Sequence, residues 1–441
     1  MKSPIPDYLH EVVEACSGDN PGSTADYIPE LAQADPDRVA VCLSTVDGVV
    51  YSAGDADAEF SIQSISKPFV YALALAEHGL DHVLARVGVE PSGEAFNELS
   101  LDSDSGRPLN PMINAGALTA HALVGPASAT TDERVERVLR GLSAFAGRDL
   151  DVDESVFESE LGTAYRNSAI ANMLRSYSVI DGDPAETVRG YTRQCAITVT
   201  VRDLAVMAAT LANGGVQPLT GQRVVPRPVV RQVLSVMMTC GMYDAAGDWM
   251  STVGIPAKSG VSGGVLGALP GQVGIGAFSP RLDPHGSSVR GVRMCTRLSD
   301  DMGLHIMDGP EPARSAIRRD RTLRGPQGHT VRVCSLQGTL QFSGAEHVLR
   351  ALSDEDAADR LDLVVLDLRR VHSVNDVADR MLREAVRRLR LDGLRVTVVD
   401  PERVLYTHPA RGDESADEVV PTLGPFLGYE RVGGGGQAAG V

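Results

Sequence analysis

The sequence predicts an α+β protein, in which an antiparallel sheet lies beside a helical region, followed by a small α/β unit. Three observations support this fold class. Residues 39–54 form two apolar runs around Asp47-Gly48, which is a strong signal for a β-hairpin. Residues 253–279 are glycine-rich and β-like, and helical patterns fill the chain between the two strand regions. After about residue 310, short apolar strands alternate with helical patterns, which predicts the second unit.

The helices of the first part are predicted from their boundary residues. Proline is tolerated only in the first turn of a helix, so Pro68 places a helix start near residues 64–67, and Gly79 ends that helix. The pair Gly214-Gly215 ends another. Pattern and boundaries together predict helices over 133–146, 167–177 and 202–213, and strands over 273–278 and 288–298.

The second part begins with a segment that carries five arginines between residues 314 and 324, with proline and glycine nearby. This composition predicts a linker or an exposed helix. Beyond it, apolar strands alternate with helical stretches near 344–353 and 377–391, and the chain ends in an acidic, then glycine-rich tail that is typical of disorder. The expected division is a first domain over 1–310, a linker over 311–329, a small α/β domain over 330–412 and a disordered tail over 413–441.

The composition argues against several functional classes. A formal net charge of −17 and a pI near 5.0 disfavour a general binder of nucleic acids or anionic membranes, which would present a basic face. Six cysteines are scattered without a C-x-x-C pair or a metal-type cluster, which is typical of reduced thiols. No apolar run is long enough to span a membrane, and the N-terminus lacks the apolar core of a signal peptide. We therefore expect a cytoplasmic protein with no metal or other cofactor.

The chain contains three lysines among 41 basic residues, and two of them stand in short motifs with serine. Lys67 closes the motif Ser64-Ile65-Ser66-Lys67, and Lys258 opens Lys258-Ser259-Gly260. Arginine stays charged in proteins, whereas a buried lysine can lose its proton near neutral pH. A lysine retained in a chain that otherwise uses arginine therefore indicates a task that arginine cannot perform.

Ser64 and Lys67 are three residues apart at the predicted helix start, so they are expected to share one helix face. A neutral lysine can take the proton of a serine hydroxyl when burial and a second cation lower its pKa, and Lys258 is the candidate for that cation. Ser66 is a rival nucleophile, but it neighbours Lys67 instead of sharing its face. An S-x-x-K motif followed about 190 residues later by K-S-G resembles the serine β-lactamases and penicillin-binding proteins.

Seven segments distinguish the chain from the β-lactamases and closely resemble the serine-dependent glutaminase family. They are ADYIPELA, FSIQSISK, GRPLNPMINAGAL, ESELGTAYRN, GYTRQCA, CGMYDAAGDW and PAKSGVSGG, in that order within roughly residues 5–308. That family is similar in fold to the serine β-lactamases and hydrolyses L-glutamine to L-glutamate and ammonia. The resemblance thus implies a serine β-lactamase-like first domain and a homo-oligomer, since family members are commonly dimers or tetramers.

The resemblance also implies a role for each matching residue. Ser64 would attack the side-chain amide of glutamine with Lys67 as general base, and Tyr243 would relay a proton to the leaving ammonia. The backbone N–H groups of Ser64 and Val261 would hold the oxyanion. A carboxylate such as Glu160 suits the α-ammonium of free glutamine. The implied catalytic residues are Ser64, Lys67, Tyr243, Lys258 and Tyr27, and the implied substrate-binding residues are Ser64, Asn114, Glu160, Asn167, Tyr191, Tyr243 and Val261.

Residues 330–412 resemble a STAS domain, the fold of sulfate-transporter and anti-sigma-factor-antagonist domains, through the segment LDLVVLDLRRVHSVNDVADRML. Regulators of this type carry a phosphorylatable serine at a helix start, where this chain has Val377. Asp376 is expected to be an N-cap, with a fixed negative charge as the alternative, and Ser373 is a weaker phosphoacceptor candidate. Such domains bind protein partners or small ligands, so a regulatory or assembly module is expected, or else a stabilising appendage.

Two other functions stay open from the sequence. Another serine acylase or a β-lactam-reactive hydrolase could use the same dyad, and labelling of Ser64 by penicillin without glutamine turnover would indicate it. Alternatively, the first domain is catalytically silent and the STAS-like domain acts as a regulator, although a decayed site has no reason to keep Lys67 and Tyr243. The expected ligand is L-glutamine, with no nucleic-acid or membrane partner.

Overall fold

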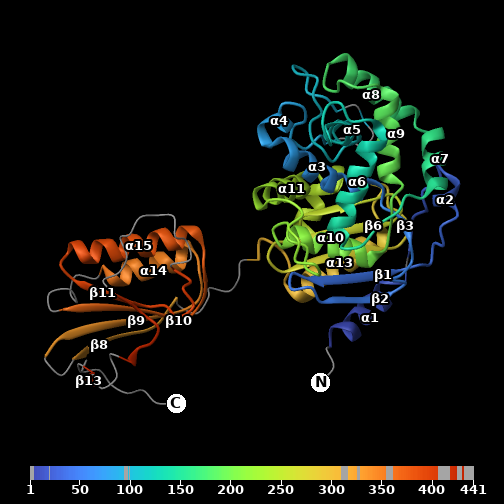
Figure 1. The fold of residues 1–441 in the computed structure, drawn as a ribbon. Helices are drawn as coiled ribbons and strands as arrows, with labels where there is room; N and C mark the ends of the chain where they lie inside the picture. The colour runs from blue at the N-terminus through green and yellow to red at the C-terminus, as the bar shows by residue number, and fades with distance from the viewer. Residues whose placement is uncertain are drawn as a thin grey trace. The chain divides into compact units, whose positions relative to one another are not determined.

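The computed structural model describes residues 4–18, 20–93, 98, 100–308, 316–324, 328–353, 361–405, 418–424 and 430–431. The chain forms two compact units, Met1–Asp308 and Gly309–Val441, and each is described by itself. The first unit contains a five-stranded sheet beside a layer of helices, and the second contains a six-stranded sheet with helices on one face (Figure 1).

The sheet of the first unit has the strand order β2-β1-β7-β6-β5, and every neighbouring pair is antiparallel, as predicted. Its strands are β1 (Ala40–Thr45), β2 (Val50–Gly54), β5 (Ala257–Ser259), β6 (Gly264–Leu269) and β7 (Val273–Phe278), and β3 (Phe60–Ser61) pairs separately with β4 (Thr198–Val199). The hairpin predicted at Asp47-Gly48 joins β1 to β2, and Gly48 there has a φ of +92°. A side chain at Gly48 would be strained in this conformation.

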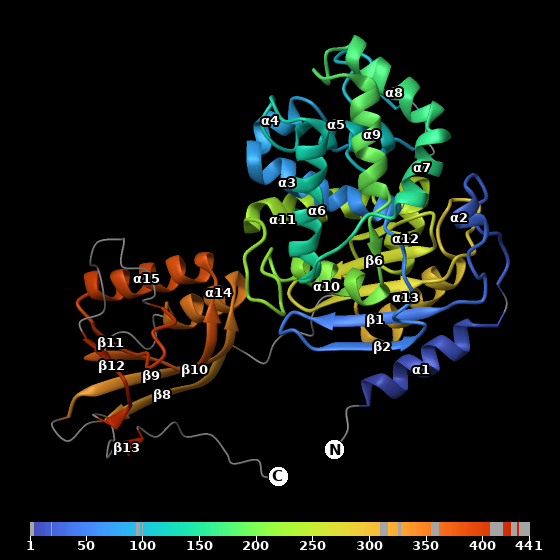
Figure 2. The same cartoon turned by 45° about the vertical axis from the view of Figure 1, so that its right-hand side comes forward.

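Helices account for most of the rest of the first unit. They are α1 (Ile5–Cys16), α2 (Pro29–Ala32), α3 (Lys67–His78), α4 (Leu80–Leu84), α5 (Asn114–Leu123), α6 (Thr131–Ala146), α7 (Glu154–Gly162), α8 (Tyr165–Ser176), α9 (Pro184–Cys195), α10 (Val201–Ala212), α11 (Arg227–Cys240), α12 (Ala246–Thr252) and α13 (Val289–Met302), with 3-10 turns η1 (Gln63–Ser66) and η2 (Tyr243–Ala245). Figure 2 shows α3 to α9 gathered on one side of the sheet. The helices predicted near 64–78, 133–146, 167–177 and 202–213 correspond to α3, α6, α8 and α10.

The side chains of β1 alternate between two helical coverings. Ala40 and Cys42 pack in a cluster with residues of α10, whereas Val41 and Leu43 pack with residues of α1 and α13. Gly274 of β7 allows α10 to approach closely, because a Cβ there would lie 2.2 Å from a backbone oxygen of that helix. The sheet is therefore buried on both faces, and the glycine-rich composition of its late strands reflects this close packing.

The segment 288–298, predicted as a strand, is instead part of the helix α13. Ser288 caps the helix N-terminus with its side chain, and Gly303 ends the helix in the left-handed conformation. Buried Met294 and Leu298 are four residues apart, which matches the period of a helix and not the two-residue period of a strand. The capping residues Ser288 and Gly303 are the sequence signals that indicate a helix here.

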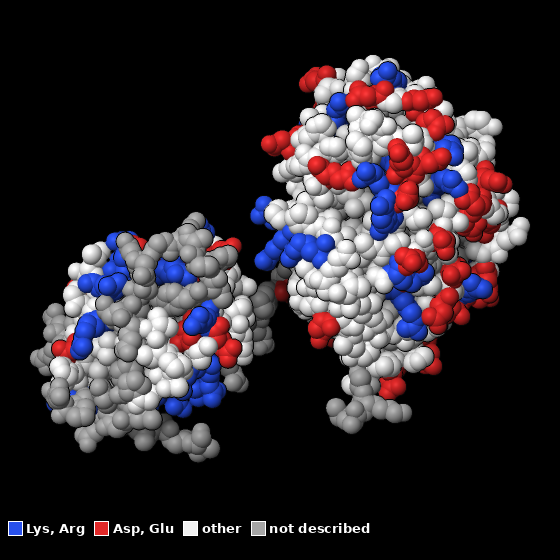
Figure 3. Space-filling view, viewed as in Figure 1, with Lys and Arg blue, Asp and Glu red and all other residues white. Residues whose placement is uncertain are grey.

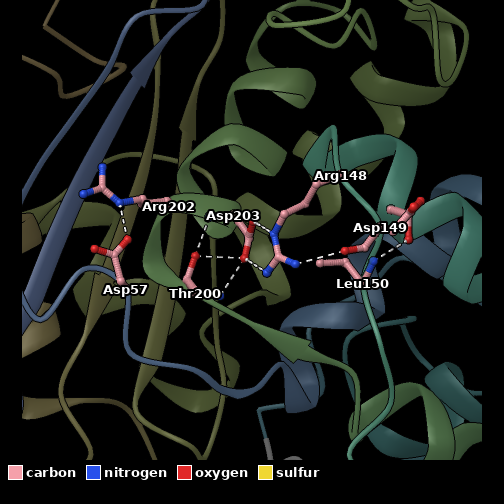
Figure 4. Close-up of polar contacts among 8 residues, drawn as sticks. Asp57, Arg148, Asp149, Leu150, Thr200, Arg202 and Asp203 are labelled. Carbon is pink, nitrogen blue, oxygen red and sulfur yellow. Dashed lines mark hydrogen bonds and ion pairs between the residues drawn. The ribbon is translucent and has the colours of Figure 1, made fainter.

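Asp203 connects the start of α10 to the segment that follows α6 (Figure 4). Its carboxylate accepts the backbone N–H of Thr200 at 2.7 Å and so completes a capping box. The same carboxylate accepts two N–H groups of Arg148, at 2.7 and 2.6 Å. The Asp203 side chain is 7% exposed, whereas the neighbouring ion pair between Arg202 and Asp57 is 42% and 83% exposed. Asp203 is therefore expected to contribute more to stability than that surface pair.

The second unit has a mixed sheet with the strand order β12-β11-β10-β9-β8-β13. Its elements are β8 (Ile317–Arg324), β9 (Thr330–Leu340), α14 (Phe342–Leu352), β10 (Leu363–Val374), α15 (Asp376–Leu391), β11 (Arg395–Val399), β12 (Glu418–Val420) and β13 (Glu430–Arg431). The run from β9 to β12 is parallel, and β8 pairs antiparallel with β9. Both α14 and α15 lie on one face of this sheet (Figures 1 and 2).

The structure differs from the sequence-based boundaries of this second part. The segment 311–329, predicted as a linker or exposed helix, contains the strand β8. Ile317 and Leu323 of this strand pack against buried apolar clusters of the second unit. The other side chains of β8 are mostly arginines, so its sequence does not resemble that of a buried strand. The tail 413–441, predicted as disordered, contains β12 and β13. Apart from residues 421–424, the rest of that tail lies outside the described residues.

The start of α15 is capped by Asn375 and not by Asp376. The Asn375 side chain accepts the backbone N–H of Ala378 at 2.8 Å, and Asp376 is the first helical residue. Ser373 is exposed and donates a hydrogen bond to the Thr339 hydroxyl at 3.2 Å. The expected N-cap is therefore displaced by one residue, because an asparagine side chain caps a helix as well as an aspartate does.

The two units differ strongly in charge. Residues 1–308 contain 22 Lys or Arg and 38 Asp or Glu, whereas residues 309–441 contain 19 and 20. Nearly all of the net negative charge therefore belongs to the first unit, where Figure 3 shows acidic side chains spread over the visible face with arginines among them. Within the part of the chain that the structure describes, no helix is long and apolar enough to cross a membrane.

Candidate active site

Ser64 lies on the 3-10 turn η1, immediately before the helix α3 that begins at Lys67. Pro68 occupies the first turn of α3, as expected from the sequence. The backbone N–H of Lys67 donates to the carbonyl of Ser64, so one tight turn separates the two residues. Ser64 is 9% exposed and Lys67 is 1% exposed. The lysine is therefore held out of water beside a serine that keeps slight access to solvent.

The surroundings of Lys67 suit a group that takes up a proton near neutral pH. Its Nζ donates to the carbonyl of Met112 at 3.0 Å and to Oδ1 of Asn114 at 2.7 Å, and lies 3.5 Å from the hydroxyl of Tyr243. Burial lowers the pKa of Lys67 to about 7. A neutral amine has two hydrogens and one lone pair. Because the two carbonyl acceptors occupy both hydrogens, the lone pair is left for the proton of a hydroxyl group.

Tyr243 connects the serine to the lysine. Its side chain is hydrogen-bonded to Ser64, and burial raises its pKa well above the ordinary value, so the hydroxyl keeps its proton at neutral pH. Tyr243 adopts a φ of +54°, a left-handed conformation that is rare for a tyrosine and costs about 1–3 kcal/mol. The surrounding structure therefore holds this phenol in place at an energetic cost, as is common at functional sites.

Lys258, the candidate second cation, lies close to the ring of Tyr243. It is fully buried on β5, and its Nζ donates to the carbonyl of Ser259 at 2.7 Å and lies 3.8 Å from the ring centroid of Tyr243. Burial, and then the charge of Lys67, lower the pKa of Lys258 well below its ordinary value. Burial is the largest cause of the low pKa of Lys67, and a contribution from the charge of Lys258 stays a prediction.

Two further polar groups contain the predicted substrate-binding residues. Glu160 on α7 accepts hydrogen bonds from the hydroxyl of Tyr27 at 2.8 Å and from Nε2 of Gln63 at 2.9 Å, both on Oε1. Burial raises the pKa of Glu160. Asn114, at the start of α5, donates from Nδ2 to Oδ1 of Asn167 on α8 at 3.0 Å. The first group presents a carboxylate, and the second is continuous with the Lys67 site through Asn114.

Tyr191 and Val261 lie beside these groups. Tyr191 on α9 is 3% exposed and is hydrogen-bonded to Cys195, and burial raises its pKa, to which the negative charge of Glu160 also contributes. Val261 lies in the turn between β5 and β6, and its side chain packs against a cluster that includes Ile28. Tyr191 thus lies on α9 and Val261 follows β5, and both of these elements pack against η1.

Sequence reasoning missed two parts of this site. Gln63 both precedes Ser64 and donates to Glu160, and its φ of +50° is left-handed. The position of Gln63 within the family segment FSIQSISK could have marked it as a candidate site residue. Its positive φ could not be predicted, because a glutamine rarely adopts one. The second is the backbone carbonyl of Met112, which accepts a hydrogen bond from Lys67. Every residue has a backbone carbonyl, so the sequence does not show which one contacts the lysine.

An antiparallel sheet beside a helical layer, with a nucleophile-type serine next to a buried neutral lysine, is typical of serine amidohydrolases of the β-lactamase-like class. Within that class, the family model for glutaminases matches residues 22–307. The glutaminase of Corynebacterium glutamicum is 52% identical over 408 residues, which cover 92% of this chain and 96% of that protein. The chain belongs to the glutaminase family.

Solved structures agree with this assignment. The crystal structure of Mglu in its glutamate form superimposes with a TM-score of 0.82 at 51% identity, over 92% of this chain and all of that one. A probable glutaminase from Bacillus subtilis, complexed with 6-diazo-5-oxo-L-norleucine, gives a TM-score of 0.63 at 33% identity, over 70% of this chain and 98% of that one. The second match covers a smaller part of this chain but nearly all of the other one.

Proposed function

We propose that this glutaminase hydrolyses the side-chain amide of L-glutamine through an acyl-enzyme on Ser64. The Ser64 hydroxyl loses its proton to Lys67 and its Oγ attacks the amide carbon, ammonia leaves with a proton returned to it, and water then releases L-glutamate. The observation that carries this proposal is the buried amine of Lys67, whose pKa is about 7 and which is linked through Tyr243 to Ser64. A general base is most effective when its pKa lies near the working pH.

Tyr243 is proposed to carry the proton between these groups. Its hydroxyl contacts both Ser64 and the Lys67 amine, so it can accept one proton while it donates another. In the second half of acylation, the same hydroxyl would deliver the proton to the leaving nitrogen. The backbone N–H groups of Ser64 and Val261 are proposed to hold the oxyanion, and such a donor is typically worth about 3–4 kcal/mol of transition-state stabilisation.

Substrate recognition is proposed to rest on the carboxylate of Glu160. Both of its hydrogen bonds from Tyr27 and Gln63 go to Oε1, so Oε2 has no hydrogen bond among the described residues and suits the α-ammonium of glutamine. Asn167 and Tyr191 would meet the α-carboxylate and the amide. A substrate that lacks these groups would leave buried polar atoms unpaired, which is costly and gives specificity.

Covalent labelling tests the nucleophile. The diazoketone 6-diazo-5-oxo-L-norleucine is the probe, and mass spectrometry locates the label in the wild type beside Ser64→Ala, with ammonia release from L-glutamine measured in parallel. We expect labelling on Ser64 and loss of both label and turnover in Ser64→Ala. Label on Ser66, or turnover in Ser64→Ala, would contradict the proposal. Acylation of Ser64 by penicillin without glutamine turnover would favour a β-lactam-reactive hydrolase instead.

We further propose that the second unit is a STAS-like module with a regulatory or assembly role. The support is its parallel run of strands from β9 to β12, with α15 entered through a capped turn at Asn375. Cutting the chain after Asp308 and measuring kcat tests whether activity depends on this unit. Full activity combined with an altered oligomeric state would support an assembly role, and unchanged activity and assembly would support a stabilising appendage. The homo-oligomer and the cytoplasmic location stay predictions, to be checked by light scattering and cell fractionation.

A further inference from the structure

Gln63 occupies a strained position directly before the nucleophile. Its φ of +50° places a non-glycine residue in the left-handed region, at a cost of about 1–3 kcal/mol. The residue is 4% exposed, and its side chain donates to Ser61 at 3.2 Å as well as to Glu160 at 2.9 Å. Such a conformation persists only where contacts with the surrounding structure hold it, so the backbone of Gln63 must be fixed by its neighbours.

A chain of three buried side chains ends on that backbone. The hydroxyl of Ser66 donates to the Gln63 carbonyl at 2.8 Å, and Nε2 of Gln194 donates to the Ser66 hydroxyl at 2.9 Å. Oε1 of Gln194 is in turn 2.9 Å from Nδ1 of His121. Ser66 is 0% exposed, and Gln194 and His121 are each 1% exposed. The chain therefore runs from α5 through α9 to η1 without contact with solvent.

The hydrogen bonds of this chain all point in one direction. Because the Gln194 amide nitrogen donates to Ser66, its oxygen must accept, and Nδ1 of His121 must carry the hydrogen. Burial lowers the pKa of His121 to about 4, so the ring is neutral at physiological pH. Gly190 packs against the far side of the ring, where a Cβ would lie 2.4 Å from Nε2. The imidazole is thus fixed in one tautomer and one position.

The Gln63 carbonyl and the Ser64 N–H belong to the same planar peptide unit. In a trans peptide these two groups point in opposite directions, so a hydrogen bond that fixes the carbonyl also fixes the N–H. We propose that Ser66, Gln194 and His121 are positioning residues that hold the peptide between Gln63 and Ser64 in the orientation that aims the Ser64 N–H at the developing oxyanion. This inference rests on the proposed function, in which that N–H is an oxyanion donor.

The proposal also explains why Ser66 is not the nucleophile. Its hydroxyl hydrogen is engaged by the Gln63 carbonyl, its oxygen accepts from Gln194, and it is inaccessible to a substrate. Ser66 therefore contacts only protein groups, and it affects catalysis through the orientation of the peptide that it holds. Removing the hydroxyl would free the strained peptide to rotate, which would weaken transition-state stabilisation while substrate binding through Glu160 persists.

Steady-state kinetics of Ser66→Ala on the full chain test this inference. We expect kcat to fall by about a hundredfold with KM changed less than about threefold, as for the loss of an oxyanion donor. The matched control is Ser299→Ala, which removes another buried serine hydroxyl donating to a backbone carbonyl, that of Val253 at 2.7 Å, and should leave kcat unchanged. Thermal melting of both variants reports whether the fold is intact.

A second variant keeps the test decisive if Ser66→Ala does not fold. Gln194→Met has a similar volume but removes the donor to Ser66, and the same selective fall in kcat is expected. Wild-type kcat in either folded variant, or a parallel loss of kcat and of binding, would overturn the positioning role. Turnover in Ser64→Ala would instead overturn the proposed function itself, so the two failures are distinguishable.

Discussion

The Nζ atom of Lys67 lies 3.5 Å from the hydroxyl oxygen of Tyr243, and that hydroxyl is hydrogen-bonded to Ser64. A serine, a phenol and an amine therefore form one continuous path for a proton. The Met112 carbonyl and the Asn114 side chain take the two hydrogens of the neutral amine. The lone pair of the neutral amine is therefore its remaining position for a proton.

The pH dependence of kcat/KM follows from the pKa of Lys67. Burial lowers that pKa to about 7, so the basic form is lost as the pH falls below this value and is complete above it. We expect kcat/KM for L-glutamine to rise tenfold per pH unit up to an inflection near 7 and then to level off. A pH profile of initial rates measures it.

Lys258→Met examines the origin of that pKa. Because burial is the largest cause of the low pKa of Lys67, replacement of Lys258 should leave the inflection within about half a unit of the wild-type value. If Lys258 were the cation that the sequence suggested, its loss would raise the pKa of Lys67 and move the inflection clearly upward.

Replacing Tyr243 by phenylalanine interrupts the proton path. Tyr243→Phe keeps the ring that packs near Lys258 but removes the hydroxyl, so we expect kcat to fall by about 10²–10⁴-fold with little change in KM. Stopped-time ammonia assays at saturating glutamine measure this. A kcat within threefold of wild type would mean that the serine proton reaches its acceptor without the phenol.

Glu160→Gln removes the anion proposed for the α-ammonium. A hydrogen bond to a charged group contributes about 1.5–3 kcal/mol, so kcat/KM should fall by about 10–100-fold. Glu158→Gln is the matched control, since Glu158 lies on the same helix α7 but is exposed. If both substitutions lowered kcat/KM equally, the negative charge of α7 as a whole, and not the position of Glu160, would determine substrate binding.

Asp203→Ala should destabilise the first unit by about 2–4 kcal/mol, because it removes the capping box of α10 and leaves Arg148 without its partner. Arg202→Ala, which breaks the exposed pair with Asp57, should change stability by less than about 1 kcal/mol. Urea unfolding of each full-length variant compares them. Similar urea midpoints for the two variants would show that the burial of Asp203 does not increase its contribution to stability.

The parts of the fold with local signals were predictable. The hairpin at Asp47-Gly48 and the helix that begins beside Pro68 are determined by residues with narrow backbone preferences, and both were predicted correctly. The strand predicted over 288–298 was wrong because Ser288 caps the start of a helix there and the buried residues follow the helical period. The strand β8 was missed because Ile317 and Leu323 are its only apolar side chains, and its pairing with β9 leaves no signal in the local sequence.

The site was predictable in its residue types but not in its electrostatics. The motifs identified Lys67 and Lys258, yet the pKa of each amine depends on its burial in three dimensions, which a motif does not report. Likewise, the left-handed conformation of Gln63 depends on distant Gln194 and on Ser66. Couplings of this kind join residues more than a hundred positions apart, so no local pattern reports them.

The most direct test of the account is ammonia release from L-glutamine by the wild type and by Lys67→Arg, with Ser64→Ala beside them. Arginine keeps the positive charge but does not accept a proton at neutral pH. The account predicts turnover by the wild type and at least about a hundredfold less in Lys67→Arg, as expected for the loss of a general base. Lys67→Arg activity within tenfold of the wild type, in a folded protein, would contradict it and assign the base to another residue.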